Sequence, residues 1–254
     1  MKIAVVTGAA SGIGSDCCND LLLHGWTVYA LDRSQKALDN SATQFRQAGG
    51  RFVPMLCDVS NGVDVTRSFA AIRKQVPVLH AVICSAGIFR AGPLLEMAEP
   101  DFDALFAVNT KGAWLTARAA LLLLKAGAGD GAPARIIFVA SIAAIRPKVG
   151  GGAYAASKVA LTQMARVLAV ELAPMGILVN AVAPATVDTP MTRQLNADAG
   201  KNNYKLSGVS PLGRVAAVAD VTSVIRFLLS NDANYLAGTI LPVDGGTSAA
   251  FDPN

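Results

Sequence analysis

The stretch that decides the fold reads IAVVTGAASGIG at positions 3–14. Its β-branched residues at 3–6 predict a short strand, and apolar residues then repeat at helical spacing from Ile13 to Leu21. Glycines let a backbone approach a pyrophosphate, and a helix that begins near Gly12 directs free N–H groups and a positive dipole end at phosphate oxygens. The stretch predicts a strand, a dinucleotide-binding turn and a helix. Its candidate cofactor-binding residues are Gly8, Ser11, Gly12, Ile13 and Gly14.

Further along the chain, short apolar runs alternate with helical segments, of which residues 102–125 and 218–229 are examples. This alternation predicts an α/β fold, a doubly wound parallel sheet with right-handed crossovers and helices on both faces. No change of composition divides the 254 residues, so we expect one domain over residues 1–254. The seven predicted strands cover residues 3–6, 27–31, 51–56, 79–84, 136–140, 177–182 and 239–243.

Candidate functional residues follow the predicted strands, at the sheet edge where open α/β sheets bind ligands. Asp32 stands at the end of the second strand, where an acid binds the adenosine ribose hydroxyls of a dinucleotide. Its alternative interpretation is a helix cap or turn aspartate. The residues at these positions are Gly12, Asp32, Asp58, Gly87, Ser141 and Pro184.

Tyr154 and Lys158 lie four positions apart in a predicted helix over residues 153–173. They therefore share one helix face, one turn apart. A cation close to a phenol favours the phenolate and lowers its pKa, so the pair predicts a general acid/base. Taken alone, Tyr-x-x-x-Lys is also a common surface pair, and the rest of the chain decides between the two interpretations.

The composition favours a buried apolar interior. Apolar residues make up 52% of the chain and charged residues 16%, with a mean hydropathy of +0.42. No uninterrupted apolar run is long enough to cross a bilayer, so we expect no membrane partner. Strands buried on both faces, and helices buried between subunits, would account for this composition. We therefore expect both a parallel sheet and an oligomer.

The charged and sulfur-containing residues exclude several function classes. The net charge of +4 comes from scattered residues without basic runs, which argues against a nucleic-acid partner. The cysteines have no C-x-x-C spacing and lie in apolar segments, so we expect four buried, reduced thiols and no metal site. Glycine interrupts the first apolar run too early for a signal peptide, so we expect a cytoplasmic protein.

Taken together, the motifs resemble the short-chain dehydrogenase/reductase family in its small, one-domain, 3-oxoacyl reductase-like form. The resemblance implies a Rossmann-type fold and reversible hydride transfer between a nicotinamide cofactor and an alcohol/carbonyl pair, in a homotetramer or, as second choice, a homodimer. It covers nearly the whole chain. The matching segments are residues 7–14, Asn109, Ser141, Tyr154-x-x-x-Lys158, Pro211-Leu212-Gly213-Arg214 and Val243-Asp244-Gly245-Gly246.

The resemblance also implies a catalytic set. Tyr154 would exchange the hydroxyl proton, and Lys158 would lower its pKa and hold the nicotinamide ribose. Ser141 would donate a hydrogen bond to the substrate oxygen. Asn109 would break a helix locally and hold a water that relays protons from Lys158.

For the cofactor, the resemblance makes Asp58 the adenine-contacting acid, and Val187 and Thr189 the residues that hold the carboxamide and pyrophosphate. Asp32 predicts NAD, because a carboxylate repels the 2′-phosphate of NADP. Arg33 could instead pair with that phosphate or stack on the adenine. The candidate cofactor-binding residues beyond the glycine turn are Asp32, Arg33, Asp58, Val59, Ser85, Ala86, Gly87, Tyr154, Lys158, Pro184, Val187 and Thr189.

Two segments depart from the family pattern. Cys84-Ser85-Ala86-Gly87 replaces Asn-Asn-Ala-Gly, which would remove amide hydrogen bonds that tie the sheet together. Pro184-Ala185 replaces Pro-Gly, so Ala185 would be strained if its φ had to be positive.

Four other functions can be compared with this one. A serine hydrolase is disfavoured, since the chain has no G-x-S-x-G motif and only His24 and His80. A nucleotide-sugar epimerase lacks room for its added substrate domain. A non-catalytic dinucleotide sensor would not need Ser141, Tyr154 and Lys158 together, and an NADPH-dependent 3-oxoacyl thioester reductase stays open.

The substrate itself is a small alcohol or carbonyl compound of unspecified structure. We expect its pocket to form from residues after Ser141, from residues 150–152 and from residues 189–207. Arg146 and Lys148 could bind an anionic substrate, but we favour solvated or subunit-facing charges.

Overall fold

In the computed structural model, the seven predicted strands form one parallel sheet with the order β3-β2-β1-β4-β5-β6-β7. The structure describes residues 1–129, 132–197, 204, 206 and 208–249. The expected doubly wound sheet is confirmed. The strands are β1 Ile3–Thr7, β2 Thr27–Asp32, β3 Arg51–Leu56, β4 Ala81–Cys84, β5 Ala134–Val139, β6 Ile177–Pro184 and β7 Ile240–Val243.

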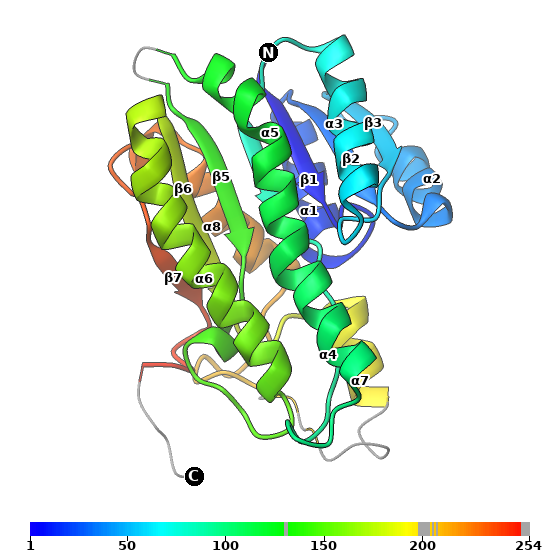
Figure 1. The fold of residues 1–254 in the computed structure, drawn as a ribbon, viewed down its shortest axis with the longest axis vertical. Coiled ribbons are helices and arrows are strands. Elements are labelled where there is room, and N and C mark those ends of the chain that lie inside the picture. The colour runs from blue at the N-terminus through cyan, green and yellow to red at the C-terminus, as the bar shows by residue number, and fades with distance from the viewer. Residues whose placement is uncertain (130–131, 198–203, 205, 207, 250–254) are drawn as a thin grey trace.

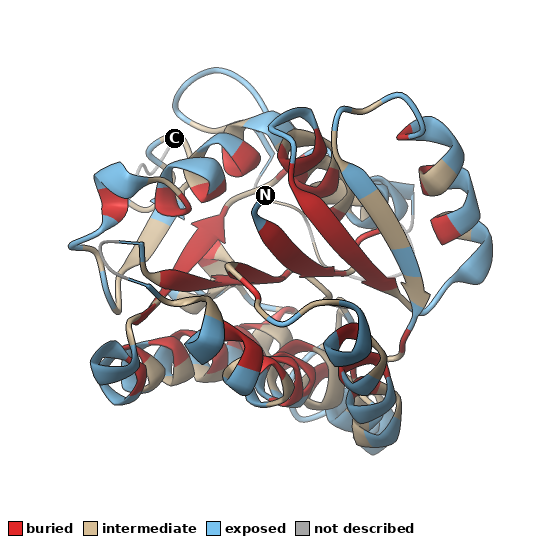
Figure 2. Cartoon of the chain, turned by 90° about the horizontal axis from the view of Figure 1, so that it is seen from above, coloured by how far each residue is buried: buried red, intermediate tan, exposed pale blue. Residues whose placement is uncertain are grey.

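Helices cover both faces of the sheet, and Figure 2 shows the buried strands between the two layers. One face packs on α3, α5 and α6, and the other packs on α1, α2 and α8 (Figure 1). The α-helices are α1 Gly12–Leu23, α2 Gln35–Gln44, α3 Gly62–Gln75, α4 Glu99–Phe106, α5 Ala113–Gly127, α6 Gly152–Leu172, α7 Pro190–Ala197 and α8 Val218–Leu228. The shorter helical turns are η1 Ala107–Gly112, η2 Ile142–Ala144, η3 Ala173–Met175 and η4 Asn231–Ala233.

The central strands are buried on both faces, which explains their unbroken apolar sequences. In β1, Val5 packs into the core below α3 and α5, whereas Val6 packs into the core below α1 and α8. All five residues of β1 and all six of β5 are buried. The apolar residues of these strands are therefore buried between the two helix layers.

Arg135 explains why β5 begins before the predicted boundary. The strand was predicted to start at Ile136, but Arg135 is only 3% exposed and belongs to the strand. Its guanidinium donates hydrogen bonds to the carbonyl oxygens of Pro133 and Ser230 and to Asn234 Oδ1. These acceptors offset the cost of burying the charge.

At the opposite strand end, β4 begins at Ala81 and not at Leu79 as predicted. The side chain of His80 contacts the neighbouring strand β1, where its Nδ1 accepts a hydrogen bond from the backbone N–H of Ile3 at 3.0 Å. Both shifts lie at the ends of strands away from the ligand-binding edge.

The expected thiol state agrees with the structure: Cys17, Cys18, Cys57 and Cys84 are all buried and free. Among the described residues, no cluster of three or more metal-ligating side chains occurs. No helix within the described ranges combines the length and the apolar character that crossing a membrane requires.

Candidate active site

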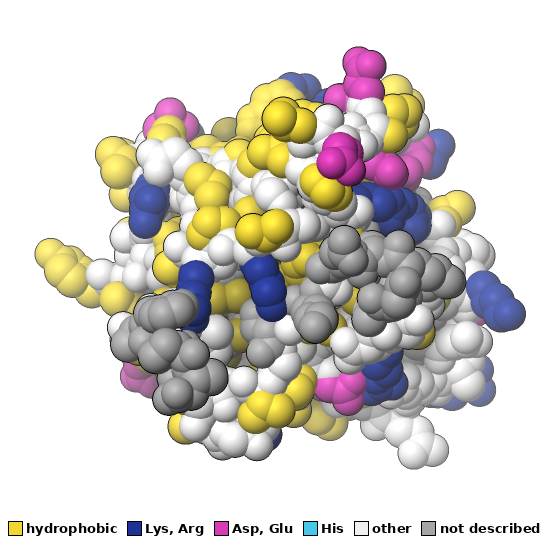
Figure 3. Space-filling model, turned by 90° about the horizontal axis from the view of Figure 1, so that it is seen from below, with side chains coloured by type: hydrophobic (Ala, Val, Ile, Leu, Met, Phe, Trp, Pro, Cys, Tyr) yellow, Lys and Arg dark blue, Asp and Glu magenta, His cyan; other side chains and the backbone are white. Residues whose placement is uncertain are grey.

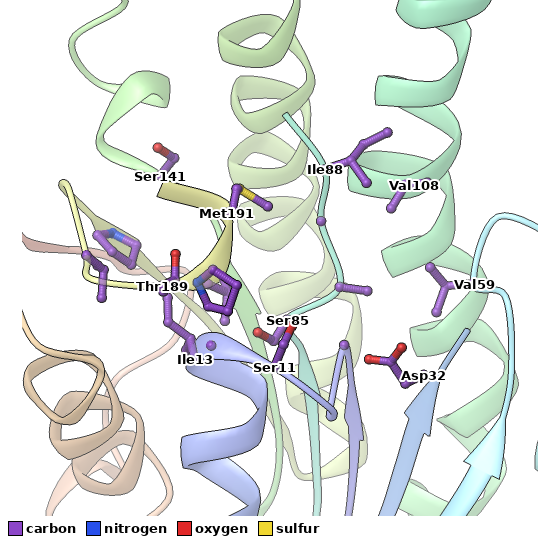
Figure 4. A pocket seen from close by; sticks show the side chains of 18 of the residues that line it. Ser11, Ile13, Asp32, Val59, Ser85, Ile88, Val108, Ser141, Thr189 and Met191 are labelled. Atoms are coloured by element: carbon purple, nitrogen blue, oxygen red, sulfur yellow. The ribbon is translucent and has the colours of Figure 1, made fainter. Parts of the chain in front are cut away.

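A cleft with a volume of about 300 Å³ opens at the carboxyl ends of the strands. It brings together every candidate site residue except Gly14 and Asn109, which do not line it. Figure 4 shows part of the lining. Pro190, Met191 and Thr192, from the expected substrate segment 189–207, also line it. The wall residues that were not predicted mostly flank the strand ends, and they are Leu31, Cys57, Ile88, Val108, Val139, Ala140 and Ala185.

The glycine turn is shaped for close backbone approach. Gly8 has a φ of +63°, and a Cβ added there would lie 2.8 Å from the Cα of Ala86. A Cβ on Gly14 would lie 2.1 Å from the carbonyl oxygen of Gly8, so α1 packs directly against the turn. Ser11 caps α1 without a side-chain hydrogen bond, which leaves N–H groups at the helix start for a ligand. These features fit a pyrophosphate.

Asp32 ends β2 beside the glycine turn (Figure 4). Its Oδ2 accepts a hydrogen bond from the backbone N–H of Ala10 at 3.1 Å, and its Oδ1 accepts one from Ser34 at 3.0 Å. The carboxylate also lines the cleft, so the turn and ligand interpretations of Asp32 are compatible. Arg33 is exposed at the same end of the cleft.

Asp58 and Val59 follow β3 and line the adjacent wall. Asp58 Oδ1 accepts hydrogen bonds from the backbone N–H and the hydroxyl of Ser60, which fix the turn after the strand. Val59 packs against Gly112, where an added Cβ would lie 2.8 Å from the valine Cγ2.

The two departures from the family pattern cause no visible defect. Among the described residues, no residue other than glycine has a positive φ, so Ala185 is unstrained. Next to Cys84 and Ser85, the backbone N–H of Ala86 donates to Thr7 Oγ1 at 3.2 Å and ties β4 to β1. This hydrogen bond is one link between the two strand ends where the family pattern has amide side chains.

Thr189 brings the segment after β6 onto the glycine turn. A Cβ on Gly12 would lie 3.3 Å from Thr189 Cγ2. Thr189 and Thr192 exchange hydrogen bonds between their hydroxyls and backbone N–H groups, and these bonds fix the start of α7. Residues 198–203, 205 and 207 of the expected substrate segment lie outside the described residues.

Ser141, Tyr154 and Lys158 meet in the cleft from the end of β5 and from α6. Ser141 Oγ accepts a hydrogen bond from the backbone N–H of Ala143 at 3.1 Å, so its own proton can be donated into the cleft. Lys158 is 4% exposed, and its Nζ donates to the carbonyl oxygen of Val139 at 2.9 Å. The same Nζ lies 5.8 Å from the ring centroid of Tyr154.

The electrostatics of this pair differ from the prediction. Burial raises the pKa of Tyr154 from 10.0 to about 12, with the Ser141 hydroxyl lowering it and Tyr204 raising it further. Burial lowers the pKa of Lys158 from 10.5 to about 8. The predicted lowering of the phenol pKa by Lys158 is therefore wrong for this arrangement, because desolvation favours the neutral form of both groups. Tyr154 holds its proton at neutral pH.

Asn109 lies in the π-helical turn η1, where the predicted local break in the helix occurs. It is fully buried, and its Oδ1 accepts a hydrogen bond from the backbone N–H of Ile88 at 2.8 Å. Its Nδ2 donates to the Ile88 carbonyl oxygen and to Ser157 Oγ, both at 3.0 Å. Asn109 thus joins the cleft wall at Ile88 to α6, next to Lys158.

An aromatic cluster packs on Tyr154. The Phe89 ring centroid lies 4.9 Å from that of Tyr154 and 4.7 Å from that of Tyr204. Gly150 and Gly151 pack on Tyr204, since a Cβ on Gly151 would lie 3.0 Å from Tyr204 Cε2. Nothing in the sequence indicated this cluster, because its members are far apart in the chain.

Comparisons with known proteins indicate the family of this chain. An enoyl-(acyl carrier protein) reductase family model matches residues 8–248. The 4-formylbenzenesulfonate dehydrogenase of Comamonas testosteroni is 36% identical over 248 residues, covering 96% of this chain and 97% of that protein. The cyclopentanol dehydrogenase of Comamonas sp. is 33% identical over 249 residues, covering 98% and 97%.

Among solved structures, the 3-ketoacyl-(acyl-carrier-protein) reductase of Brucella melitensis complexed with NADH matches with a TM-score of 0.87 and 27% identity. The match covers 97% of this chain and 98% of that chain. The family resemblance inferred from the motifs is thereby confirmed over nearly the full length. We conclude that the chain belongs to the short-chain dehydrogenase/reductase family of oxidoreductases.

Proposed function

We propose that this oxidoreductase transfers a hydride between NAD(H) and a secondary alcohol or its ketone. One observation carries the proposal: Ser141, Tyr154 and Lys158 line the same cleft as the glycine turn and Asp32. A dinucleotide held at the turn and a substrate oxygen at Tyr154 would therefore share one enclosed space.

Residues of this chain would transfer the proton and bind the substrate oxygen. In the reducing direction, the protonated Tyr154 donates its proton to the carbonyl oxygen, while Ser141 donates a hydrogen bond to the same oxygen. The pKa of Lys158 is about 8, so its ammonium can release a proton more readily than an ordinary lysine and return it to the Tyr154 phenolate. A dinucleotide bound at the glycine turn would supply or accept the hydride, which is the chemistry of its nicotinamide.

The residues present fit a dinucleotide. The free N–H groups at the start of α1, with Thr189, would hold the pyrophosphate, and Asp32 would accept hydrogen bonds from the adenosine ribose. Asp58 and Val59 would border the adenine, and Val187 the carboxamide. We propose NAD as the preferred cofactor, because Asp32 would repel a 2′-phosphate.

The names of the relatives indicate which substrate classes to consider. Cyclopentanol is a secondary alcohol, which supports the assignment, whereas 3-ketoacyl reductases act on thioesters. Reduction of 3-oxoacyl thioesters with NADPH is the second candidate, and the exposed Arg33 at the ribose end favours it. A homotetramer and a cytoplasmic location stay predictions from the sequence.

The direct test is a substrate screen that follows nicotinamide absorbance. The purified chain is incubated with secondary alcohols, sugars, diols and β-hydroxy thioesters, each with NAD and with NADP. We expect turnover of one or more secondary alcohols, with higher kcat/KM for NAD. Turnover of the thioesters alone, with NADP, would favour the second candidate, and no turnover at all would favour a non-catalytic sensor.

A further inference from the structure

Lys148 lies at the outer end of the aromatic cluster that packs on Tyr154. Its Nζ is 5.8 Å from the ring centroid of Tyr204, whose ring packs on Phe89, which in turn packs on Tyr154. Lys148 precedes α6 in the loop that also carries Gly150 and Gly151, so the loop holds the lysine and makes room for Tyr204. The ammonium thus lies two rings away from the proposed acid/base.

The ammonium of Lys148 has a cation–π contact but no hydrogen-bond acceptor or carboxylate within the described part of the chain. Partial burial, together with the neighbouring Arg146, holds the pKa of Lys148 below its ordinary value. Removing a cation partly from water without a counter-ion costs free energy that an incoming anion would recover.

Other cations of the chain have polar partners within it. Arg90 pairs with Asp101 at 3.1 Å, and Arg193 pairs with Asp188 at 2.6 Å. Arg146 donates a hydrogen bond to the carbonyl oxygen of Thr247. Figure 3 views the molecule from the ends of the strands and shows Lys and Arg side chains beside hydrophobic ones at the centre of this face.

We propose that Lys148 and the aromatic wall of Phe89 and Tyr204 form a subsite for an anionic group on the substrate. The rings would contact a flat, apolar part of the substrate, and the ammonium would pair with a carboxylate or sulfonate on its far side. This inference rests on the proposed function, since it places the reacting carbonyl at Tyr154. The substrate class is a ketone or secondary alcohol that also carries an acidic group.

The test compares two ligands of nearly equal shape that differ in charge. Calorimetric titration of the chain saturated with NAD measures the Kd for 4-acetylbenzoate and for the neutral 4-acetylbenzamide. We expect the carboxylate to bind at least about tenfold more tightly, in the range of a charge-assisted contact at a partly buried site. Raising the salt concentration should reduce this preference.

Three variants assign the preference to Lys148. Lys148→Met keeps a long apolar side chain and should abolish the preference, whereas Lys148→Arg should retain most of it. The control Lys74→Met removes an exposed lysine from the last turn of α3 and should leave the preference unchanged. Circular dichroism of each variant verifies folding.

Equal Kd values for the two ligands, a preference that survives Lys148→Met, or no binding of either ligand at millimolar concentration would each overturn the subsite. These results leave the proposed function standing if the chain still oxidises neutral secondary alcohols with NAD. Failure to turn over any alcohol would overturn the proposed function by a separate measurement.

Discussion

The Asp32 carboxylate accepts a hydrogen bond from the backbone N–H of Ala10 and so joins the end of β2 to the glycine turn. The same side chain lines the cleft. One carboxylate therefore shapes the proposed pyrophosphate site and borders the ribose site next to it. Replacing Asp32 by alanine would disturb both, and a test of cofactor choice needs a substitution that keeps the acceptor.

Asp32→Asn meets this need, because its amide oxygen can still accept the Ala10 bond while the charge, and the second bond from Ser34, are lost. Two like charges about 4 Å apart cost on the order of a few kcal/mol at an effective dielectric near 20, which is a discrimination of a hundredfold or more. We expect the wild-type kcat/KM to favour NAD, and Asp32→Asn to reduce that preference mainly through a lower KM for NADP. A wild-type preference for NADP would contradict this account and make Arg33 the deciding residue.

Asn109→Ala removes three hydrogen bonds that join Ile88, η1 and α6. Each buried group left without a partner costs about 1–3 kcal/mol, so urea denaturation should show a clear loss of stability. We also expect kcat to fall, because Ile88 is part of the cleft wall.

The matched control for Asn109 is Asn61→Ala, which removes the exposed cap of α3. This change should cost about 1 kcal/mol and leave kcat unaltered. An Asn109→Ala variant with wild-type kcat would show that Asn109 only stabilises the fold.

The parallel sheet and the site edge could be predicted from the sequence, because the predicted strands are short apolar runs followed closely by a glycine, aspartate, serine or proline. The order of the strands in the sheet was not predicted. Boundaries were missed where a polar residue is buried with partners from distant segments. Arg135 bonds to Ser230 and Asn234, and these contacts exist only in the folded chain.

The substrate side was harder to predict for the same reason. Phe89, Tyr154 and Tyr204 come together from three loops or helices, and nothing in their local sequences marks the contact. The sign of the Tyr154 pKa shift was also missed, because the sequence gives the spacing to Lys158 but not the burial of both groups.

Lys158 should make stability depend on pH. Its pKa is lowered by burial to about 8, so the fold disfavours the charged form. The resulting cost is fully present below pH 8 and disappears as the pH rises toward the ordinary lysine pKa.

A Lys158→Met variant lacks this pH dependence. Its stability relative to wild type should fall by about 2 kcal/mol between pH 7 and pH 10, as measured by urea denaturation at both values. The exposed Lys125→Met serves as the control and should show no such change. An identical difference between wild type and Lys158→Met at both pH values would contradict the lowered pKa.

Apolar side chains remain exposed on α5 and α6, which lie together on one face of the molecule (Figure 1). Leu122 on α5 is 64% exposed, and Val170 on α6 is 77% exposed. We predict that these helices pair between subunits of a homotetramer, with a homodimer as second choice. Light scattering should give a multiple of 26.2 kDa, and Val170→Asp should lower that mass. A single-chain mass for the wild type at micromolar concentration would contradict the prediction.

The central claim is that Tyr154 exchanges the substrate proton during hydride transfer. Tyr154→Phe removes only the hydroxyl, and Tyr235→Phe makes the same change at a fully exposed position as a control. The decisive measurement is kcat for a secondary alcohol found in the substrate screen, together with the Kd for NAD. The account predicts a loss of about 10²- to 10⁴-fold in kcat for Tyr154→Phe with nearly unchanged NAD binding, and no loss for Tyr235→Phe. Wild-type turnover by Tyr154→Phe would contradict it.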